Sequence, residues 1–162
     1  MPGRPERRSG KQHRQEVIPL LSKPKHGWCI VGISSWSDRA SYIDDVPVEL
    51  LQAIQTVLSV NEPAAVLFDA EGWEFTIEFY PEQVEITTCD QDDEVTTRVF
   101  DLPAYYLAAD LIKDIRRDLD DWVMWPVWSD EPWFNKKEQQ GRRDQLLTYC
   151  DIIERLLPKH FS

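Results

Sequence analysis

The segment between residues 64 and 100 constrains the fold more than any other part of this chain. Residues 73–79 (WEFTIEF) and 84–88 (VEITT) alternate apolar and polar side chains, which is typical of strands with one buried face. Residues 64–68 and 95–100 supply a further strand on either side, and turns containing glycine, proline or acidic residues separate the four strands. Because short connections favour antiparallel neighbours, the segment predicts a meandering antiparallel sheet.

Apolar patterns before and after this segment predict the rest of an α+β domain. Residues 28–33 (WCIVGI) are expected to form a buried strand, followed by a polar connection over residues 34–41. The expected fold is one antiparallel sheet of about five strands with helices packed on one face. Apolar side chains at intervals of three and four residues predict these helices over residues 47–60, 103–122 and 136–157. The polar side of the second helix is expected to carry Asp110, Lys113, Asp114, Arg117, Asp118 and Asp121.

The chain of 162 residues is long enough for one domain with its own core. Residues 1–25 hold seven basic and two acidic groups and are polar over most of their length, so we expect a disordered basic tail. Residues 26–162 are expected to form a single globular domain. No apolar run approaches the length of a membrane span. Three widely spaced cysteines suit a reducing compartment, which predicts a cytoplasmic protein with buried, unreactive thiols.

Acidic residues are concentrated in the predicted sheet. The net charge is −11, and residues 38–101 contain 16 acidic residues against only Arg39 and Arg98. Such a body repels nucleic acid, whose phosphates require clustered lysine and arginine. Two interpretations remain open: the charge serves solubility alone, or it attracts a basic protein through a complementary field.

The carboxylates that would carry such a field fall into two groups. One group alternates with the apolar side chains of the central strands and therefore faces solvent, and the other forms the loop before the last strand. We expect these residues to form a partner-binding surface: Glu74, Glu78, Glu85, Asp90, Asp92, Asp93 and Glu94.

The most unusual segment is residues 122–134 (WVMWPVWSDEPWF), which holds four tryptophans, one phenylalanine and two prolines. The prolines exclude a regular helix through the whole segment. These rings either pack into the core or serve as anchors on a partner surface, where tryptophan is enriched. Trp128 and Trp133, which flank Asp130 and Glu131, are the candidate exposed anchors.

Motifs for catalysis and cofactor binding are missing from the sequence. It contains no phosphate-binding glycine loop, no nucleophile elbow and no paired-cysteine or paired-histidine metal motif. His13, His26 and His160 lie near the ends of the chain, which argues against a histidine-based catalytic or metal site. The run from Asp90 to Glu94 is too short for a calcium loop and lacks its glycine. We therefore expect no catalytic residue, no metal site and no cofactor.

The chain resembles the small acidic immunity proteins of bacterial toxin–immunity systems, including contact-dependent inhibition and other polymorphic toxins. The resemblance rests on the hairpin WEFTIEFYPEQVEITTCD, the acidic balance and the tryptophan-rich segment WVMWPVW. It implies a non-enzymatic α+β protein that covers the active site of a cognate basic toxin, often a nuclease. The acidic body and the lack of a membrane span predict that the chain binds neither nucleic acid nor membrane. Two other functions remain open: an enzyme with a carboxylate-based or metal-assisted site, and an adaptor that uses residues 122–134.

Overall fold

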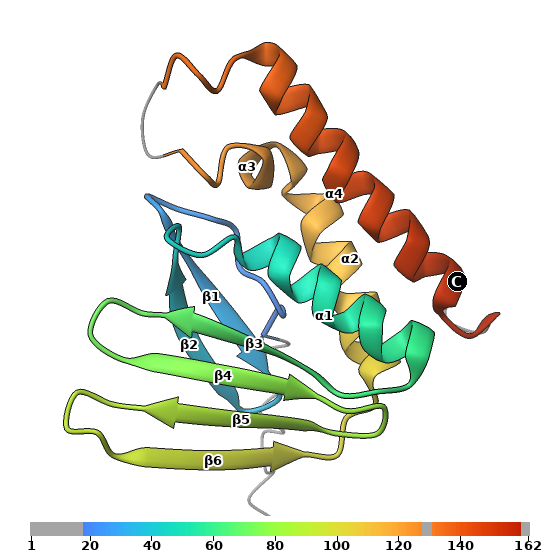
Figure 1. Cartoon of the computed structure of the whole chain (residues 1–162). Helices are drawn as coiled ribbons and strands as arrows, with labels where there is room; N and C mark the ends of the chain where they lie inside the picture. The colour runs from blue at the N-terminus through green and yellow to red at the C-terminus, as the bar shows by residue number, and fades with distance from the viewer. Residues whose placement is uncertain (1–17, 128–130, 160–162) are drawn as a thin grey trace, which may run out of the picture.

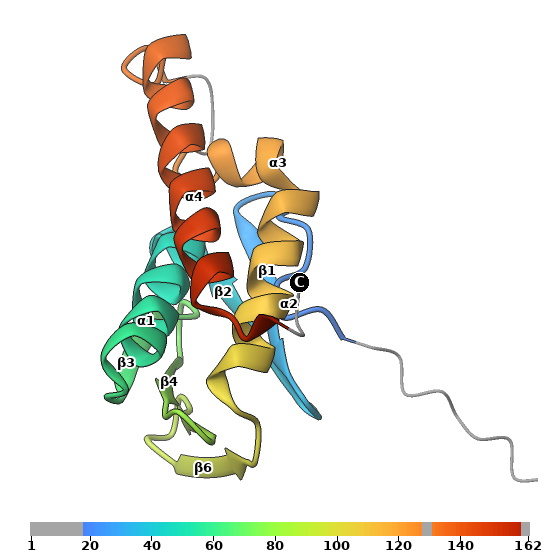
Figure 2. The ribbon, with the colours of Figure 1, turned by 90° about the vertical axis from the view of Figure 1, so that its right-hand side faces the viewer.

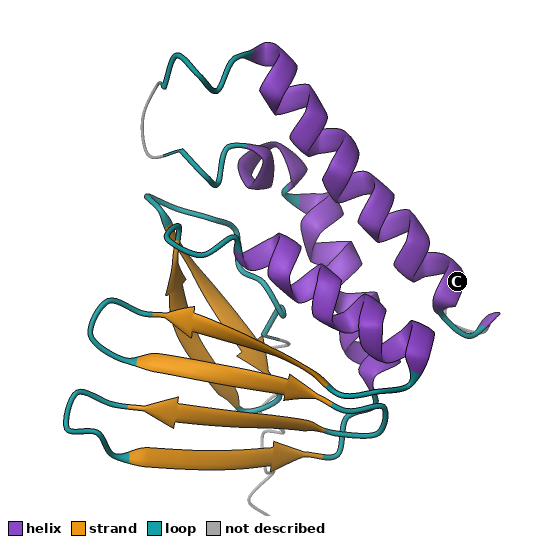
Figure 3. Ribbon diagram, viewed as in Figure 1, coloured by secondary structure: helices purple, strands orange, loops and turns teal. Residues whose placement is uncertain are grey.

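The computed structural model describes residues 18–127 and 131–159 and confirms an α+β fold (Figures 1 and 3). Its strands form two antiparallel sheets, β1–β2 and β3–β4–β5–β6, so the expectation of one sheet was wrong. None of the helices in the described part of the chain is long and apolar enough to cross a bilayer. The elements in chain order are β1 (Trp28–Ile33), β2 (Trp36–Ser41), α1 (Val46–Val60), β3 (Ala64–Asp69), β4 (Glu74–Phe79), β5 (Val84–Cys89), β6 (Val95–Phe100), α2 (Ala104–Arg117), α3 (Leu119–Val123) and α4 (Lys136–Leu156).

The four-stranded sheet is the predicted meander, with each strand paired to the next one in sequence. Alternation separates its two faces: Phe75, Ile77 and Phe79 of β4 are fully buried, while Glu74 is exposed and Glu78 is half-buried. The inner face is thus apolar and belongs to the core. The outer face is polar along its two central strands and carries no helix in Figures 1 and 2.

The second sheet is a hairpin that the sequence did not reveal. Residues 36–41 (WSDRAS), expected to be a polar connection, form β2 and pair with β1 along its whole length. Trp36 is buried and its ring meets that of Phe75 edge-on, with centroids 5.1 Å apart. Phe75 in turn contacts Phe68 of β3 at 5.5 Å, so one ring of β4 joins the two sheets.

The three long helices lie together at the β3 end of the four-stranded sheet (Figures 1 and 2). α1 packs against β3 and β4, and α4 packs against both α1 and α2. The second helix ends at Arg117, and the short α3 follows, so the continuous helix expected up to residue 122 is divided in two. At the start of α4, the Asn135 side chain accepts hydrogen bonds from the amides of Lys137 and Glu138, which caps the helix.

The first described residues form a short segment that is hydrogen-bonded to α2. Leu20 and Leu21 are buried, and Leu21 pairs with Val31 at the free edge of β1. The amide of Leu21 donates to the carboxylate of Asp114 at 3.0 Å, and Arg117 bonds both that carboxylate and the carbonyl of Leu21. Residues 18–25, which fall within the predicted tail, therefore belong to the described fold. Asp114, expected on the polar side of the helix, is buried by this contact.

Candidate functional site

Three of the predicted partner-binding carboxylates share the outer face of the four-stranded sheet. Glu74 and Glu78 lie on β4 and Glu85 lies on β5, all pointing away from the buried rows of the inner face. Glu78 and Glu85 are directly opposite in the register. Like charges in directly opposed positions destabilise a sheet, so this pair lowers the stability of the free protein.

Tyr80 adds a hydroxyl to this end of the outer face. Its hydrogen bond to Glu78, its partial burial and the charges of Glu78 and Glu85 raise the pKa of Tyr80 to about 12. The neutral phenol therefore remains a donor to the carboxylate throughout the physiological pH range. Tyr80 lies between the predicted strands 73–79 and 84–88, at the next alternate position after Glu78.

The remaining four predicted carboxylates form the turn between β5 and β6. One carboxylate oxygen of Asp90 accepts hydrogen bonds from the amides of Asp92 and Glu94, each at 2.9 Å. Asp93 takes a left-handed backbone conformation with φ of 58°, as three-residue hairpin loops require. Asp90 thus shapes the turn, while Asp92, Asp93 and Glu94 are exposed at its tip.

Cys89 connects the two groups of carboxylates. It faces Glu74 across the β4–β5 pair and precedes the acidic turn. Partial burial and the charges of Asp93, Glu74 and Asp90 raise the pKa of its thiol. Cys29 and Cys150 are buried as expected, but Cys89 is only half-buried. We name the surface formed by Glu74, Glu78, Glu85, Asp90, Asp92, Asp93 and Glu94 the acidic face.

The acidic face is not neutralised by ion pairs within the described residues. Four arginines of α2 and α4 pair instead with helical or loop carboxylates, for example Arg116 with Glu154 at 2.9 Å and Arg142 with Asp45 at 2.8 Å. None of the seven carboxylates of the acidic face forms an ion pair in residues 18–127 or 131–159. Their negative potential is therefore directed outward.

A thiol reaction at Cys89 measures this potential directly. We expect a cationic methanethiosulfonate reagent to modify Cys89 faster than an anionic one. The ratio of these two rates should be at least about tenfold larger for Cys89 than for free cysteine, because a negative surface potential of several kT attracts the cationic reagent and repels the anionic one. The raised pKa slows both reagents equally, so their rate ratio isolates the field. The ratio should fall towards that of free cysteine at high salt.

Mass spectrometry would follow this modification, with Cys89→Ser as the control for the two buried thiols. A Glu74→Gln variant should lower the ratio, because it removes the carboxylate opposite the thiol. If the ratio of the cationic to the anionic rate were the same for Cys89 as for free cysteine, this result would contradict an acidic face whose charges are not compensated.

The tryptophan-rich segment is divided between core and surface. Trp122 and Trp125 are buried and their ring centroids lie 5.3 Å apart. Trp133 is 60 % exposed and its ring rests edge-on against Phe134, which is buried. Trp128 lies outside the described residues. In Figure 1 the described parts of the connection between α3 and α4 lie near those helices and away from β5 and β6, so this segment is separate from the acidic face.

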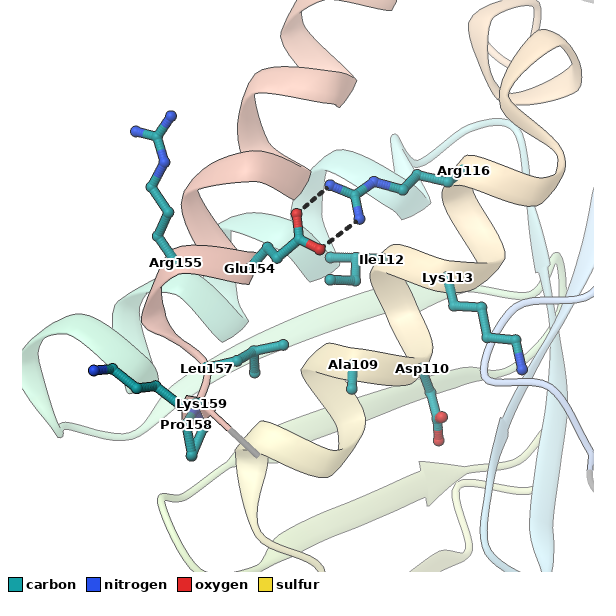
Figure 4. Close-up of a pocket in the computed structure, with 10 residues that line it drawn as sticks. All are labelled: Ala109, Asp110, Ile112, Lys113, Arg116, Glu154, Arg155, Leu157, Pro158 and Lys159. Atoms are coloured by element: carbon teal, nitrogen blue, oxygen red, sulfur yellow. Dashed lines mark hydrogen bonds and ion pairs between the residues drawn. The ribbon is translucent and has the colours of Figure 1, made fainter. Parts of the chain in front are cut away.

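A pocket of about 620 Å³ lies between α2 and the end of α4 (Figure 4). Burial and the charge of Asp114 raise the pKa of Asp110, whereas the hydrogen bonds and charge of Arg116 lower the pKa of Glu154. Figure 4 shows Arg116 and Glu154 joined and Asp110 extending away from them. The pocket therefore does not present two facing carboxylates of the kind that acid–base hydrolysis uses.

Neither metal coordination nor similarity to known proteins gives further information on this site. Within the described residues no three side chains of histidine, cysteine, aspartate or glutamate are grouped so that they could hold a metal ion. Comparisons with protein-family models, with curated proteins and with solved structures found no match to this chain.

Proposed function

We propose that this chain is a non-enzymatic binding protein that uses its acidic face to dock on a basic protein. The observation that supports this proposal is the placement of the ion pairs: Arg116, Arg117 and Arg143 pair with carboxylates of the helical layer, whereas no ion pair within the described residues reaches the acidic face. A protein that needed acidic groups only for solubility would gain nothing from the opposed Glu78 and Glu85.

The partner that fits best is a cognate toxin domain with a basic, nuclease-like active site. A cationic cleft built for phosphates would be attracted by the acidic face and blocked by the sheet behind it, so inhibition would follow from occlusion. Long-range attraction would mainly raise the association rate, by about ten- to a thousandfold at low salt. Such neutralisation would take place in the cytoplasm of the producing cell.

Co-expression tests this proposal. The chain should be expressed together with each protein encoded beside its own gene, and growth and co-purification should be measured. We expect one basic neighbour to arrest growth alone and to be tolerated as a stable complex with this chain. Salt should weaken the complex, because exposed charges are screened beyond a Debye length of about 8 Å at physiological ionic strength. If no growth-arresting neighbour is neutralised, the immunity proposal is wrong.

An adaptor function is the second candidate, and the exposed ring of Trp133 favours it. A tryptophan residue that is 60 % exposed, next to the buried Phe134, has the geometry of an interface anchor. Trp133→Ala in the same co-expression assay separates the two candidates. An adaptor would lose its complex through this variant, whereas an inhibitor that binds through the acidic face would retain it.

A further inference from the structure

β6 forms one edge of the four-stranded sheet and lies at the end of the molecule opposite α4 (Figures 1 and 2). The amide of Asp90 donates to the carbonyl of Glu94 at 3.0 Å, which fixes where the alternating hydrogen bonds between β5 and β6 begin. From that point every second residue of β6 turns its backbone N–H and C=O away from β5. These outward residues are Val95, Thr97 and Val99, and no backbone hydrogen bond within the described residues occupies them.

The exposed edge of β6 has few of the features that prevent pairing with another strand. Natural edges are protected by lysine, proline, bulges or a covering helix. β6 has no proline, and Val95 and Val99 are 62 % and 50 % exposed. Its one charged side chain, Arg98, donates to the hydroxyl of Ser35 at 2.8 Å and lies over the ring of Phe100. Arg98 is thus held by two contacts, of which the one with Ser35 directs it toward the first hairpin.

At the opposite edge of the sheet, β3, some of the outward backbone groups already form hydrogen bonds. At β3 the amide of Asp69 donates to the carboxylate of Asp44 at 2.8 Å, and the carbonyl of Asp69 accepts from the hydroxyl of Ser41 at 3.5 Å. Only Ala65 and Leu67 keep outward backbone groups there, and α1 packs alongside this strand. Of the two edges, β6 therefore offers the longer row of unoccupied donors and acceptors.

We infer that β6 receives an extended basic segment of the partner as a fifth strand of this sheet, a binding mode that rests on the proposed function. Main-chain hydrogen bonds to an edge strand supply affinity, and alternate side chains supply specificity. Lysine or arginine on the outer side of the added strand would extend over Val99 toward Glu85. Apolar side chains on the inner side of the added strand would place no second positive charge beside Arg98. A second copy of this chain fits less well, because it carries the same net charge of −11.

A synthetic peptide, acetyl-VKVKVKV-amide, is the probe for this edge. Added to the full chain, it should slow amide hydrogen exchange at Val95, Thr97 and Val99 at least tenfold, as measured by NMR. The exchange of Thr96 and Arg98, whose amides already point to β5, should not change. The same peptide with N-methyl groups on alternate residues, and a peptide with glutamate for lysine, should give no protection.

Two proline variants provide a matched comparison of the edges. The amides of Thr97 and Leu67 both point outward, so proline at either position removes no backbone hydrogen bond of the sheet. Thr97→Pro also removes the 3.3 Å hydrogen bond between the Thr87 and Thr97 hydroxyls. Thr97→Pro should abolish peptide binding and weaken the complex with the growth-arresting neighbour by at least tenfold, whereas Leu67→Pro should leave both unchanged. Unfolding curves of the two variants would show whether either has lost its fold.

The inference is overturned if the peptide protects none of the three amides, or if the N-methylated peptide binds equally well. It is also overturned if the free chain protects these amides by forming a dimer. Should the complex with the toxic neighbour survive Thr97→Pro unchanged, the edge is not the binding site, although the acidic face can still be. Failure of neutralisation by the unmodified chain removes the proposed function itself, so the two failures are distinguishable.

Discussion

Replacement of Glu85 by lysine is expected to stabilise the free protein and, at the same time, to slow its association with the basic partner. Glu85 lies directly opposite Glu78, so the variant converts a repulsive pair into an attractive one. Cross-strand pairs of this kind contribute up to about 1 kcal/mol to the free energy of unfolding. Association should slow by about tenfold at low salt, because the steering charge of the acidic face is reduced.

The double variant Glu78→Lys/Glu85→Lys separates the two effects. It restores a like-charged pair, so its stability should return towards that of the unmodified protein, while its association rate should fall further. Glu138→Lys/Asp144→Lys is the matched control, because it changes the net charge equally on α4, which packs against the other helices. Urea unfolding and stopped-flow association would measure both quantities. An association rate that follows net charge alone, with equal losses in both double variants, would contradict a localised acidic face.

Phe75→Ala is expected to have the largest effect on stability, a loss of about 3–5 kcal/mol in the free energy of unfolding. Phe75 is fully buried and contacts Trp36 from one sheet and Phe68 from the other. Removing its ring leaves a cavity where the two sheets meet, and the aromatic contacts on both sides are lost together. Because folded domains have about 5–15 kcal/mol of stability, this variant would approach the limit of folding.

Leu67→Ala is the control for this prediction. Leu67 lies on the outer face of the neighbouring strand and is 52 % exposed, so its truncation should cost less than about 1 kcal/mol. Denaturant unfolding monitored by tryptophan fluorescence would measure both variants. Similar losses for Phe75→Ala and Leu67→Ala would show that the sheets do not depend on the central ring.

Local sequence patterns predicted the four-stranded sheet because each strand carries its own signal. Strict alternation in β4 and a short turn on either side were enough to place Glu74, Glu78 and Glu85 on one face. β2 has no such signal: its sequence WSDRAS becomes a strand because β1 supplies the hydrogen bonds and because Trp36 and Ala40 meet the core. Strands stabilised mainly by tertiary contacts escape a search for periodicity.

The site was predictable to a similar extent. The number and placement of the acidic residues followed from the sequence. The absence of ion pairs at the acidic face, within the described residues, did not follow from it, because pairing depends on which helices meet. Asp114 shows the converse case, since a carboxylate in a charged helical pattern became buried through a contact with residue 21. The half-burial of Cys89 and its position among the carboxylates likewise required the strand register.

The contact between Leu21, Asp114 and Arg117 determines where this protein can be shortened. A variant that began after Leu21 would leave the Asp114 carboxylate without its backbone donor, Arg117 without one acceptor, and the free edge of β1 without its partner residue. Affinity tags and fluorescent fusions should therefore be joined upstream of residue 18, the first residue that the structure describes. Joined there, a fusion leaves intact the segment that connects the first hairpin to α2.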